Sequence, residues 1–159
     1  MRSFYKHRIS RFYVMAKDVR HGFLFLYIEK IFRTVVSGTL GNLLCKRTAE
    51  KYGIKLNFYY SHLDWHRLDY PIGSSGRALG RPTDQQNWQS YYKFMNDQLT
   101  ELLTNYGSIG AIWFDGVWDH AGDATPFNWQ LEEQYALIHR LQPSCLVGNN
   151  HHKDLNPGE

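Results

Sequence analysis

The sequence predicts an α/β fold with parallel strands, and two observations support this prediction. Residues 51–159 alternate between short β-prone runs and longer segments with apolar residues at helical spacing, in the order β-loop-α-β-loop-α-β. Polar residues suited to chemistry follow the predicted strands at their C-terminal ends, where parallel α/β proteins place their active sites. The chain has 159 residues, enough for one ordinary core.

The first predicted strand covers residues 54–60, a short run rich in aromatic residues. Residues 61–83 form a long loop rich in Gly, Pro, Ser and Arg, and loops of this length are usually functional or disordered. Thr83 or Asp84 is expected to cap a helix that runs to about Asn105.

The second predicted strand, Ile109–Asp115, is an apolar run that ends on one carboxylate. Asn128 is expected to cap the following helix, which Pro143 stops because proline cannot continue a helix. A third strand begins at Leu146–Gly148. This order requires right-handed crossovers between parallel strands.

Residues 1–50 differ in composition from the rest of the chain. They hold ten Lys and Arg against three Asp and Glu, whereas residues 51–159 hold eight against twelve. A basic segment of this kind can bind nucleic acid or a membrane surface. It carries no recognisable binding motif and no clean amphipathic period, so no nucleic-acid partner is expected.

Several features of the sequence bear on location and cysteine chemistry. The chain has no uncharged apolar run of about 18 residues, so no membrane span is predicted. The apolar stretch Phe23–Ile31 is interrupted by Glu29 and Lys30 and does not form a clear signal peptide, which leaves the localisation unknown. Cys45 and Cys145 lie far apart and indicate neither a disulfide framework nor a metal signature.

Asp115 is the strongest candidate for a catalytic residue. It lies at the tip of the second predicted strand, between Trp113 and Trp118, which combines a nucleophile or base with aromatic faces that stack on sugar rings. In retaining glycosidases a second acid lies about 5–5.5 Å from the nucleophile and protonates the leaving oxygen. Asp119 and Asp123, on the loop beyond, are expected to be solvated or to cap a helix. A purely structural alternative is that Asp115 only caps the next helix.

A metal-dependent hydrolase is a further alternative. The candidate ligands are His62, His66, His120, His151, His152 and Asp115. Three of them would suffice for a hydrolytic zinc ion. The loop around His62 and His66 contains Pro and Gly, and adjacent histidines such as His151 and His152 point in different directions on a strand. These features favour the sugar chemistry over the metal.

Four stretches resemble the α-L-fucosidases of glycoside hydrolase family 29. They are FYYSHLDW (58–65), IWFDG (112–116), QYALIHRLQP (134–143) and GNNHH (148–152). The resemblance runs from about Arg47 to the last residue. It implies a partial (β/α)₈ TIM-like barrel with parallel strands. It also implies a retaining glycosidase without cofactor or metal that removes terminal α-L-fucose from a fucosylated oligosaccharide or glycoconjugate.

The resemblance also assigns roles to individual residues. It implies that Asp115 is the nucleophile and that Tyr59 and Trp113 line the fucose pocket. His62 and Trp65 fall in the matching loop after the first strand and are implied as further sugar contacts.

The acid/base residue has two candidates. Glu159 follows Asp115 at a plausible separation in the chain, and a glutamate beyond the last residue is the alternative. A catalytically inactive remnant, or a weak fucose-binding module that uses Trp65, Trp113 and Trp118, is the alternative to an active enzyme.

The family carries a His-His-Asp-Gly-Phe strand end upstream, and this chain retains only fragments of it. The most similar residues are 16–17 and 20–23. The number of residues from Phe23 to Lys51 is nevertheless about what the family would have. The motif is lost while its distance from the following segment is retained. We therefore predict that residues 1–46 are an atypical basic head translated in a shifted reading frame. Residues 47–159 are then the partial fucosidase catalytic barrel.

Overall fold

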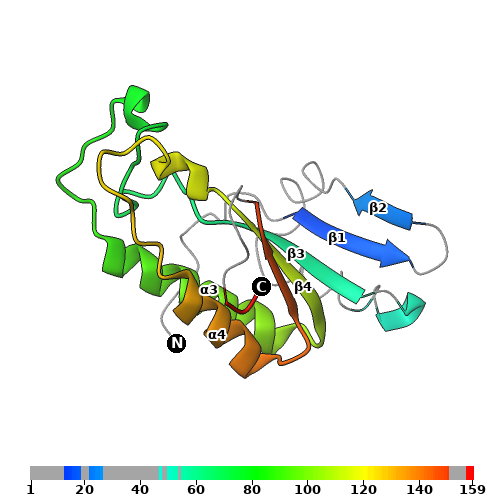
Figure 1. Cartoon of the computed structure of the whole chain (residues 1–159). Helices are drawn as coiled ribbons and strands as arrows, with labels where there is room; N and C mark the ends of the chain where they lie inside the picture. The colour runs from blue at the N-terminus through cyan, green and yellow to red at the C-terminus, as the bar shows by residue number, and fades with distance from the viewer. Residues whose placement is uncertain (1–12, 19–21, 27–46, 48–49, 54, 151–156) are drawn as a thin grey trace, which may run out of the picture.

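The computed structural model describes residues 13–18, 22–26, 47, 50–53, 55–150 and 157–159. Within these residues, five strands form one sheet in the order β2-β1-β3-β4-β5. Two long helices, α3 (Trp88–Asn105) and α4 (Leu131–Leu141), lie side by side against the sheet (Figure 1). The predicted α/β class is therefore confirmed.

Three neighbouring strands of the sheet are parallel, as the sequence predicts. They are β3 (Lys55–Ser61), β4 (Ile109–Asp115) and β5 (Leu146–Asn149). The bounds of β4 agree with the prediction because one apolar run ends at Asp115 and Gly116 follows. A helix connects each parallel strand to the next, as parallel strands require.

The first part of the chain, for which the sequence predicts no strand, contributes two antiparallel strands to the described sheet. Strands β1 (Tyr13–Asp18) and β2 (Gly22–Leu26) pair antiparallel with each other, and β1 pairs antiparallel with β3. Only three positions separate β1 from β2, whereas a parallel pair needs a crossover of a dozen residues or more. The sequence gives no alternating pattern strong enough to predict this pair.

Helix α3 (Trp88–Asn105) begins later than the sequence predicts. Asn87 is its N-cap: it has extended backbone angles, and its side-chain oxygen accepts a hydrogen bond from the backbone N–H of Ser90 at 3.0 Å. Thr83 instead belongs to a turn in which its carbonyl accepts from the N–H of Gln86. Several capping residues precede this helix, and the sequence alone does not decide between them.

Helix α4 (Leu131–Leu141) also has a different start from the one predicted. The residue before it is Gln130, with a left-handed φ of 54°. Asn128 does not cap the helix; its side chain accepts from the N–H of Gln130 at 3.0 Å, which forms a local turn. The helix ends two residues before Pro143, as expected.

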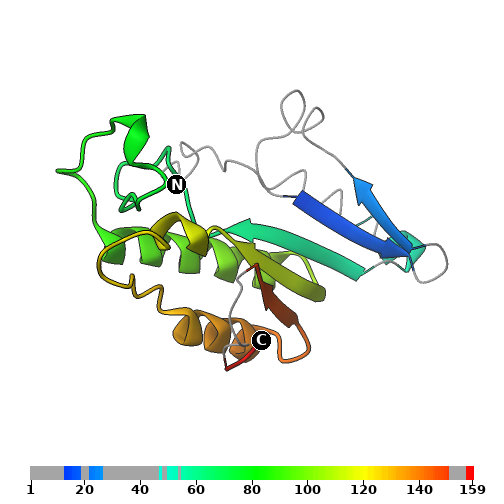
Figure 2. The ribbon, with the colours of Figure 1, turned by 45° about the horizontal axis from the view of Figure 1, so that its top comes forward.

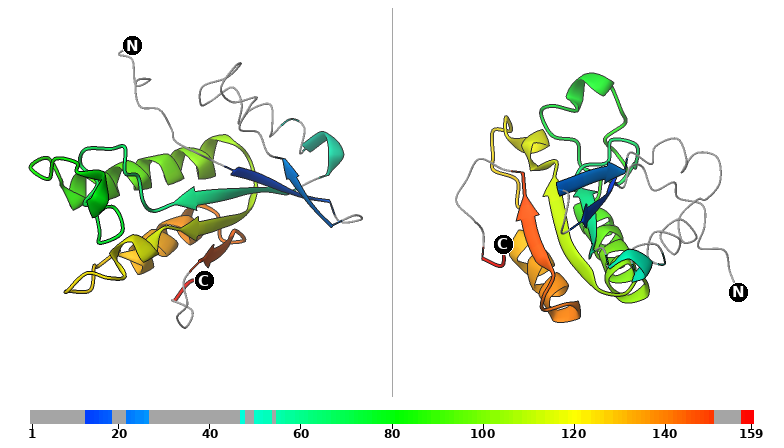
Figure 3. Two further views of the ribbon diagram at one scale, coloured as in Figure 1. Left: turned by 90° about the horizontal axis from the view of Figure 1, so that it is seen from above. Right: turned by 90° about the vertical axis from the view of Figure 1, so that its right-hand side faces the viewer.

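The core lies between the sheet and the two helices, and Figure 3 shows this packing from two sides. The sheet contributes Leu56, Phe58, Tyr60, Ile112, Phe114 and Val147. The helices contribute Tyr91, Met95, Leu99, Leu102, Tyr135 and Ile138. Gln134 of α4 donates to Asn96 of α3 at 3.1 Å, which joins the helices on this face.

The alternation of a β-strand places the intervening residues on the opposite face of the sheet, away from α3 and α4. In β3 and β4 the buried positions alternate with less buried ones, so Tyr59, Trp113 and Asp115 share that face. Two 3₁₀-helices, η1 (Arg77–Leu79) and η2 (Val117–His120), lie beyond the C-terminal ends of β3 and β4 (Figure 2). The loops that follow β3 and β4 therefore lie at the same end of the sheet.

Candidate active site

Asp115 is the last residue of β4 and lies at the end of the sheet where the loops gather. Its carboxylate accepts hydrogen bonds from four groups. Oδ2 accepts from the Tyr59 hydroxyl at 2.7 Å, and Oδ1 accepts from the backbone N–H of Gly116 at 2.7 Å. The indole Nε1 of Trp118 and the side-chain amide of Asn150 lie 3.1 and 3.4 Å from Oδ1. The carboxylate is therefore held by residues from three parts of the chain.

Gly116 makes the geometry around Asp115 possible. Its φ of 105° favours glycine, and a Cβ there would lie 2.9 Å from the backbone nitrogen of Leu63. The chain can therefore turn sharply after β4 and begin η2 at once. This turn returns the side chain of Trp118 to the carboxylate of Asp115.

The two residues predicted to line the sugar pocket lie beside Asp115 on the same face. Tyr59 of β3 is opposite Trp113 of β4 in the parallel register. The Trp113 side chain is 44% exposed, and Gly148 of β5 lies opposite it on the other side. The structure thus brings three of the predicted site residues together: Tyr59, Trp113 and Asp115.

His62 does not join this group. The family resemblance implies a sugar contact for His62, whereas the structure buries it completely on the helix-covered face. Its Nε2 lies 2.8 Å from Oε1 of Gln134, and its ring packs against Phe114 and Trp129. Burial lowers the pKa of His62 to about 4. The reason for its position is alternation, because His62 follows the buried Tyr60 at the period of a strand.

Trp65 contacts Trp118, which in turn donates a hydrogen bond to Asp115. Its ring meets the ring of Trp118 edge-on, with centroids 6.0 Å apart. Its backbone carbonyl accepts from the Arg81 guanidinium, which also bonds the carbonyl of Arg67. Trp65 therefore packs beside Trp118 and supports it.

Glu159, the candidate acid/base, lies against α4. Its Oε1 accepts from the Tyr135 hydroxyl at 3.0 Å, and the carbonyl of the preceding Gly158 contacts Nε2 of His139 at 2.7 Å. Tyr135 is fully buried on the helix-covered face. Asp115 faces the other side of the sheet, so the structure does not present the two carboxylates to one another as a catalytic pair.

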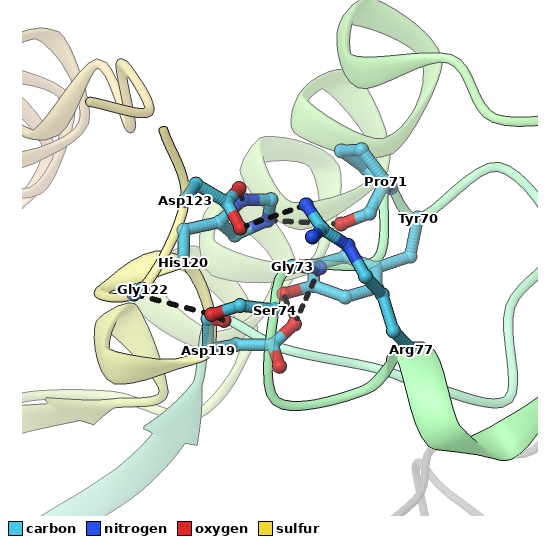
Figure 4. A network of polar contacts seen from close by, with 9 residues as sticks. All are labelled: Tyr70, Pro71, Gly73, Ser74, Arg77, Asp119, His120, Gly122 and Asp123. Carbon is cyan, nitrogen blue, oxygen red and sulfur yellow. Dashed lines mark hydrogen bonds and ion pairs between the residues drawn. The ribbon is translucent and has the colours of Figure 1, made fainter. Parts of the chain in front are cut away.

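Asp119 is fully buried, contrary to the expectation that it is solvated or caps a helix. Its Oδ2 accepts from the Tyr70 hydroxyl at 2.7 Å and from the N–H of Gly73 at 3.0 Å (Figure 4). Its carbonyl accepts from the N–H of Ser75 and the hydroxyl of Ser74. The contacts join η2 to the long loop after β3. Sequence reasoning misses this network because Tyr70 lies 49 positions away.

The neighbouring His120 makes a second connection between the same loops, also drawn in Figure 4. Its Nδ1 lies 2.6 Å from Oδ2 of Asp123, and its Nε2 lies 3.0 Å from the carbonyl oxygen of Pro71. Both ring nitrogens of His120 therefore have a polar partner. Burial alone would raise the pKa of Asp123, but His120 and Arg77 hold it below its usual value. The ring of His120 stacks on the ring of Phe127, with centroids 3.9 Å apart.

The described residues form no group of three His, Cys, Asp or Glu side chains placed to hold a metal ion. Of the candidate ligands, His62 contacts Gln134 and His120 contacts Asp123 and Pro71. His151 and His152 lie outside the described residues.

In the described part of the chain, no helix has the length and apolar character needed to cross a membrane.

The site combines a strand-end carboxylate with exposed indoles, an arrangement typical of sugar-processing α/β proteins. The α-L-fucosidase family model matches residues 40–158, more than half of the chain. The chain therefore belongs to the α-L-fucosidase family, a family of glycoside hydrolases, and the resemblance predicted from the sequence is confirmed.

Individual relatives are similar to parts of this chain. Alpha-L-fucosidase 1 of Arabidopsis thaliana is 33% identical over 100 residues, which cover 62% of this chain and 16% of that protein. The solved alpha-L-fucosidase isoenzyme 1 from Paenibacillus thiaminolyticus is 35% identical, with a TM-score of 0.49 over 65% of this chain and 26% of that one. Unliganded alpha-L-fucosidase AlfC from Lactobacillus casei is 24% identical, with a TM-score of 0.52 over 67% of this chain and 35% of that one. The chain thus spans only a minor part of each relative.

Proposed function

We propose that this chain carries the nucleophile of a retaining α-L-fucosidase, with Asp115 attacking C1 of a terminal α-L-fucose in a glycoconjugate. The observation that supports this proposal is the environment of Asp115. The carboxylate is held by four donors at the end of a parallel strand that also carries Trp113, and one donor is Trp118; each of these tryptophans is 44% exposed. Fixed donors keep the nucleophile in position, and exposed indoles offer apolar faces to a sugar.

The proposed reaction has two steps. In the first, a lone pair of the Asp115 carboxylate forms a bond to C1, and the bond from C1 to the glycosidic oxygen breaks with its electron pair. A carboxylic acid gives its proton to the departing oxygen. In the second step, water attacks C1 and gives a proton to the acid/base residue, which lost its own proton in the first step. The ester bond breaks and returns the electron pair to Asp115, so fucose leaves with its original configuration.

Glu159 stays one of the two candidates for the acid/base because of its separation from Asp115 along the chain. Its place against Tyr135 and α4 requires a rearrangement before it can reach a sugar on the opposite face. A glutamate beyond the last residue remains the alternative. The position of Glu159 therefore favours a second candidate function, a weak fucose-binding module that keeps Trp113 and Trp118 but lacks turnover.

We further propose that β3, β4 and β5 belong to a partial (β/α)₈ barrel whose inner side is the face of the sheet away from α3 and α4. Three parallel neighbours with their connecting helices on one face support this arrangement, as does the fold likeness to AlfC. Tyr59, Trp113 and Asp115 would then face the barrel axis at its C-terminal end.

Hydrolysis of an aryl α-L-fucoside tests the function. The wild-type chain is expected to release the aryl alcohol and α-configured fucose. Asp115→Asn and Asp115→Ala are expected to reduce release to background. Asp97→Asn is the matched control, because Asp97 pairs with Lys93 on the exposed side of α3. Retained hydrolysis by a folded Asp115 variant would refute the assignment. Fucose-dependent changes in Trp fluorescence without hydrolysis would favour the binding module.

A further inference from the structure

The two carboxylate oxygens of Asp115 have different partners. Oδ1 accepts from the N–H of Gly116 at 2.7 Å and from Nε1 of Trp118 at 3.1 Å, with Asn150 further away at 3.4 Å. Oδ2 accepts from the Tyr59 hydroxyl at 2.7 Å. A carboxylate oxygen has two lone pairs in the plane of the group. The two short contacts occupy those of Oδ1, whereas Oδ2 keeps one for another partner.

We propose that Trp118 is a positioning residue, which together with the N–H of Gly116 fixes Oδ1 of Asp115 and leaves Oδ2 as the oxygen that attacks fucose. This inference rests on the proposed function. It assigns to the indole of Trp118 a hydrogen-bonding task in addition to any stacking on the sugar.

The position of the Trp118 indole is determined by its surroundings, although the side chain is 44% exposed. The turn at Gly116 and the 3₁₀-helical hydrogen bond from the N–H of Asp119 to the Gly116 carbonyl fix the backbone. The carbonyl of Trp118 accepts from the N–H of Ala121 at 3.1 Å. The ring of Trp65 supports the indole edge-on. The N–H of Trp118 is thus directed at Oδ1 before a substrate binds.

This arrangement affects the two chemical steps differently. In the first step Oδ2 gives a lone pair to C1, and the pair of the breaking glycosidic bond leaves with the aglycone oxygen. Oδ1 becomes the carbonyl oxygen of an ester and is then a weaker acceptor than a carboxylate oxygen. In the second step the C1–Oδ2 bond breaks and its pair returns to the carboxylate. The N–H of Trp118 stabilises the returning charge, so its loss slows the second step more than the first.

Proton NMR of the indole groups tests the hydrogen bond without any turnover. Single Trp→Phe variants assign the five indole N–H signals. The Trp118 signal is expected to move upfield in Asp115→Ala, and less in Asp115→Asn, which keeps an acceptor. The signal of Trp88, whose Nε1 donates to Gln130, is the control and should stay in place. A Trp118 signal that neither variant moves overturns the proposal.

Steady-state and burst kinetics of Trp118→Phe test the role in turnover. Loss of one charge-assisted hydrogen bond is expected to lower kcat about tenfold. KM should fall as well, so that kcat/KM changes less and a burst of aryl alcohol appears. Trp88→Phe is expected to leave both values unchanged. Equal losses in kcat and kcat/KM would overturn the positioning role. Turnover in Asp115→Ala would instead contradict the proposed function, and the NMR result would stand by itself.

Discussion

Gly148 lies opposite Trp113 across the β4–β5 pair, and the indole occupies the space that a side chain at position 148 would need. A Cβ at Gly148 would lie 2.9 Å from Cε3 of Trp113 and 3.0 Å from Cζ3. These separations are shorter than van der Waals contact. The small residue in β5 therefore allows the ring of Trp113 to extend over the sheet beside Asp115.

Gly148→Val should displace the Trp113 ring and destabilise the fold by about 1–3 kcal/mol, the usual cost of overpacking. Urea unfolding followed by circular dichroism measures the loss. The same substitution in a Trp113→Ala background is the control, because the space is then empty and most of the cost should disappear. Equal costs in both backgrounds would show that the ring does not occupy this space.

His62 should make stability depend on pH in mildly acidic solution. Burial lowers its pKa to about 4 in the folded state, whereas an unfolded chain protonates it near pH 6.5. Between these values the unfolded state binds more protons, so stability falls as the pH falls from 6.5 to 4. The full loss is about 3 kcal/mol. Urea unfolding at a series of pH values measures it.

The variant His62→Leu separates this effect from other titrating groups. It should be less stable than the wild type at pH 7, because Gln134 loses its partner. Its stability should nevertheless change less between pH 6.5 and 4. Parallel pH profiles of the two proteins would contradict the assignment to His62.

Asp119→Ala should be among the most damaging substitutions in the loops. It leaves the Tyr70 hydroxyl and the Gly73 N–H without their buried acceptor, which should cost about 3–5 kcal/mol. Tyr70→Phe removes only one donor and should cost about 1–2 kcal/mol. A double-mutant cycle read by thermal unfolding measures the coupling between the two residues. Strictly additive effects would show that the hydrogen bond contributes nothing.

Trp113→Ala should weaken the binding of L-fucose about tenfold, because the exposed indole offers an apolar face to the sugar beside Asp115. Isothermal titration calorimetry measures the affinity. Trp88→Phe is a control that changes an indole at the start of α3, on the other side of the sheet from Asp115. Unchanged affinity in Trp113→Ala would remove Trp113 from the sugar site.

The shifted-frame hypothesis for residues 1–46 stays a prediction. Sequencing the encoding DNA tests it directly. An intact codon series for His-His-Asp-Gly-Phe in another frame, at the spacing the family keeps, would support the hypothesis. If no frame contains it, the basic head is the native coding sequence.

The parts of the fold that depend on local pattern could be predicted from the sequence. Strand β4 and the position of Asp115 follow from one apolar run ended by glycine. The burial of His62 was also open to prediction, since it continues the alternation of Tyr60. The burial of Asp119 was not, because its partners come from a distant loop.

The same limit applies to the hydrogen bond from Trp118 to Asp115. Both residues stand out in the sequence, and only the left-handed turn at Gly116 brings the indole N–H to the carboxylate. The predicted N-caps of the two helices were wrong for a different reason. Asn87 and its neighbours compete for one helix start, and the chain geometry selects among them.

The distance along the chain between Tyr59 and Asp115 has a consequence for the order of folding. The two residues share a hydrogen bond across the β3–β4 pair but are 56 positions apart. Helix α3 lies between them and can form from local contacts, whereas the parallel pair must first close a long loop. We therefore expect the helices to form early in refolding and the hydrogen bonds around Asp115 to form late. No peptide taken from a single strand or loop can hold it.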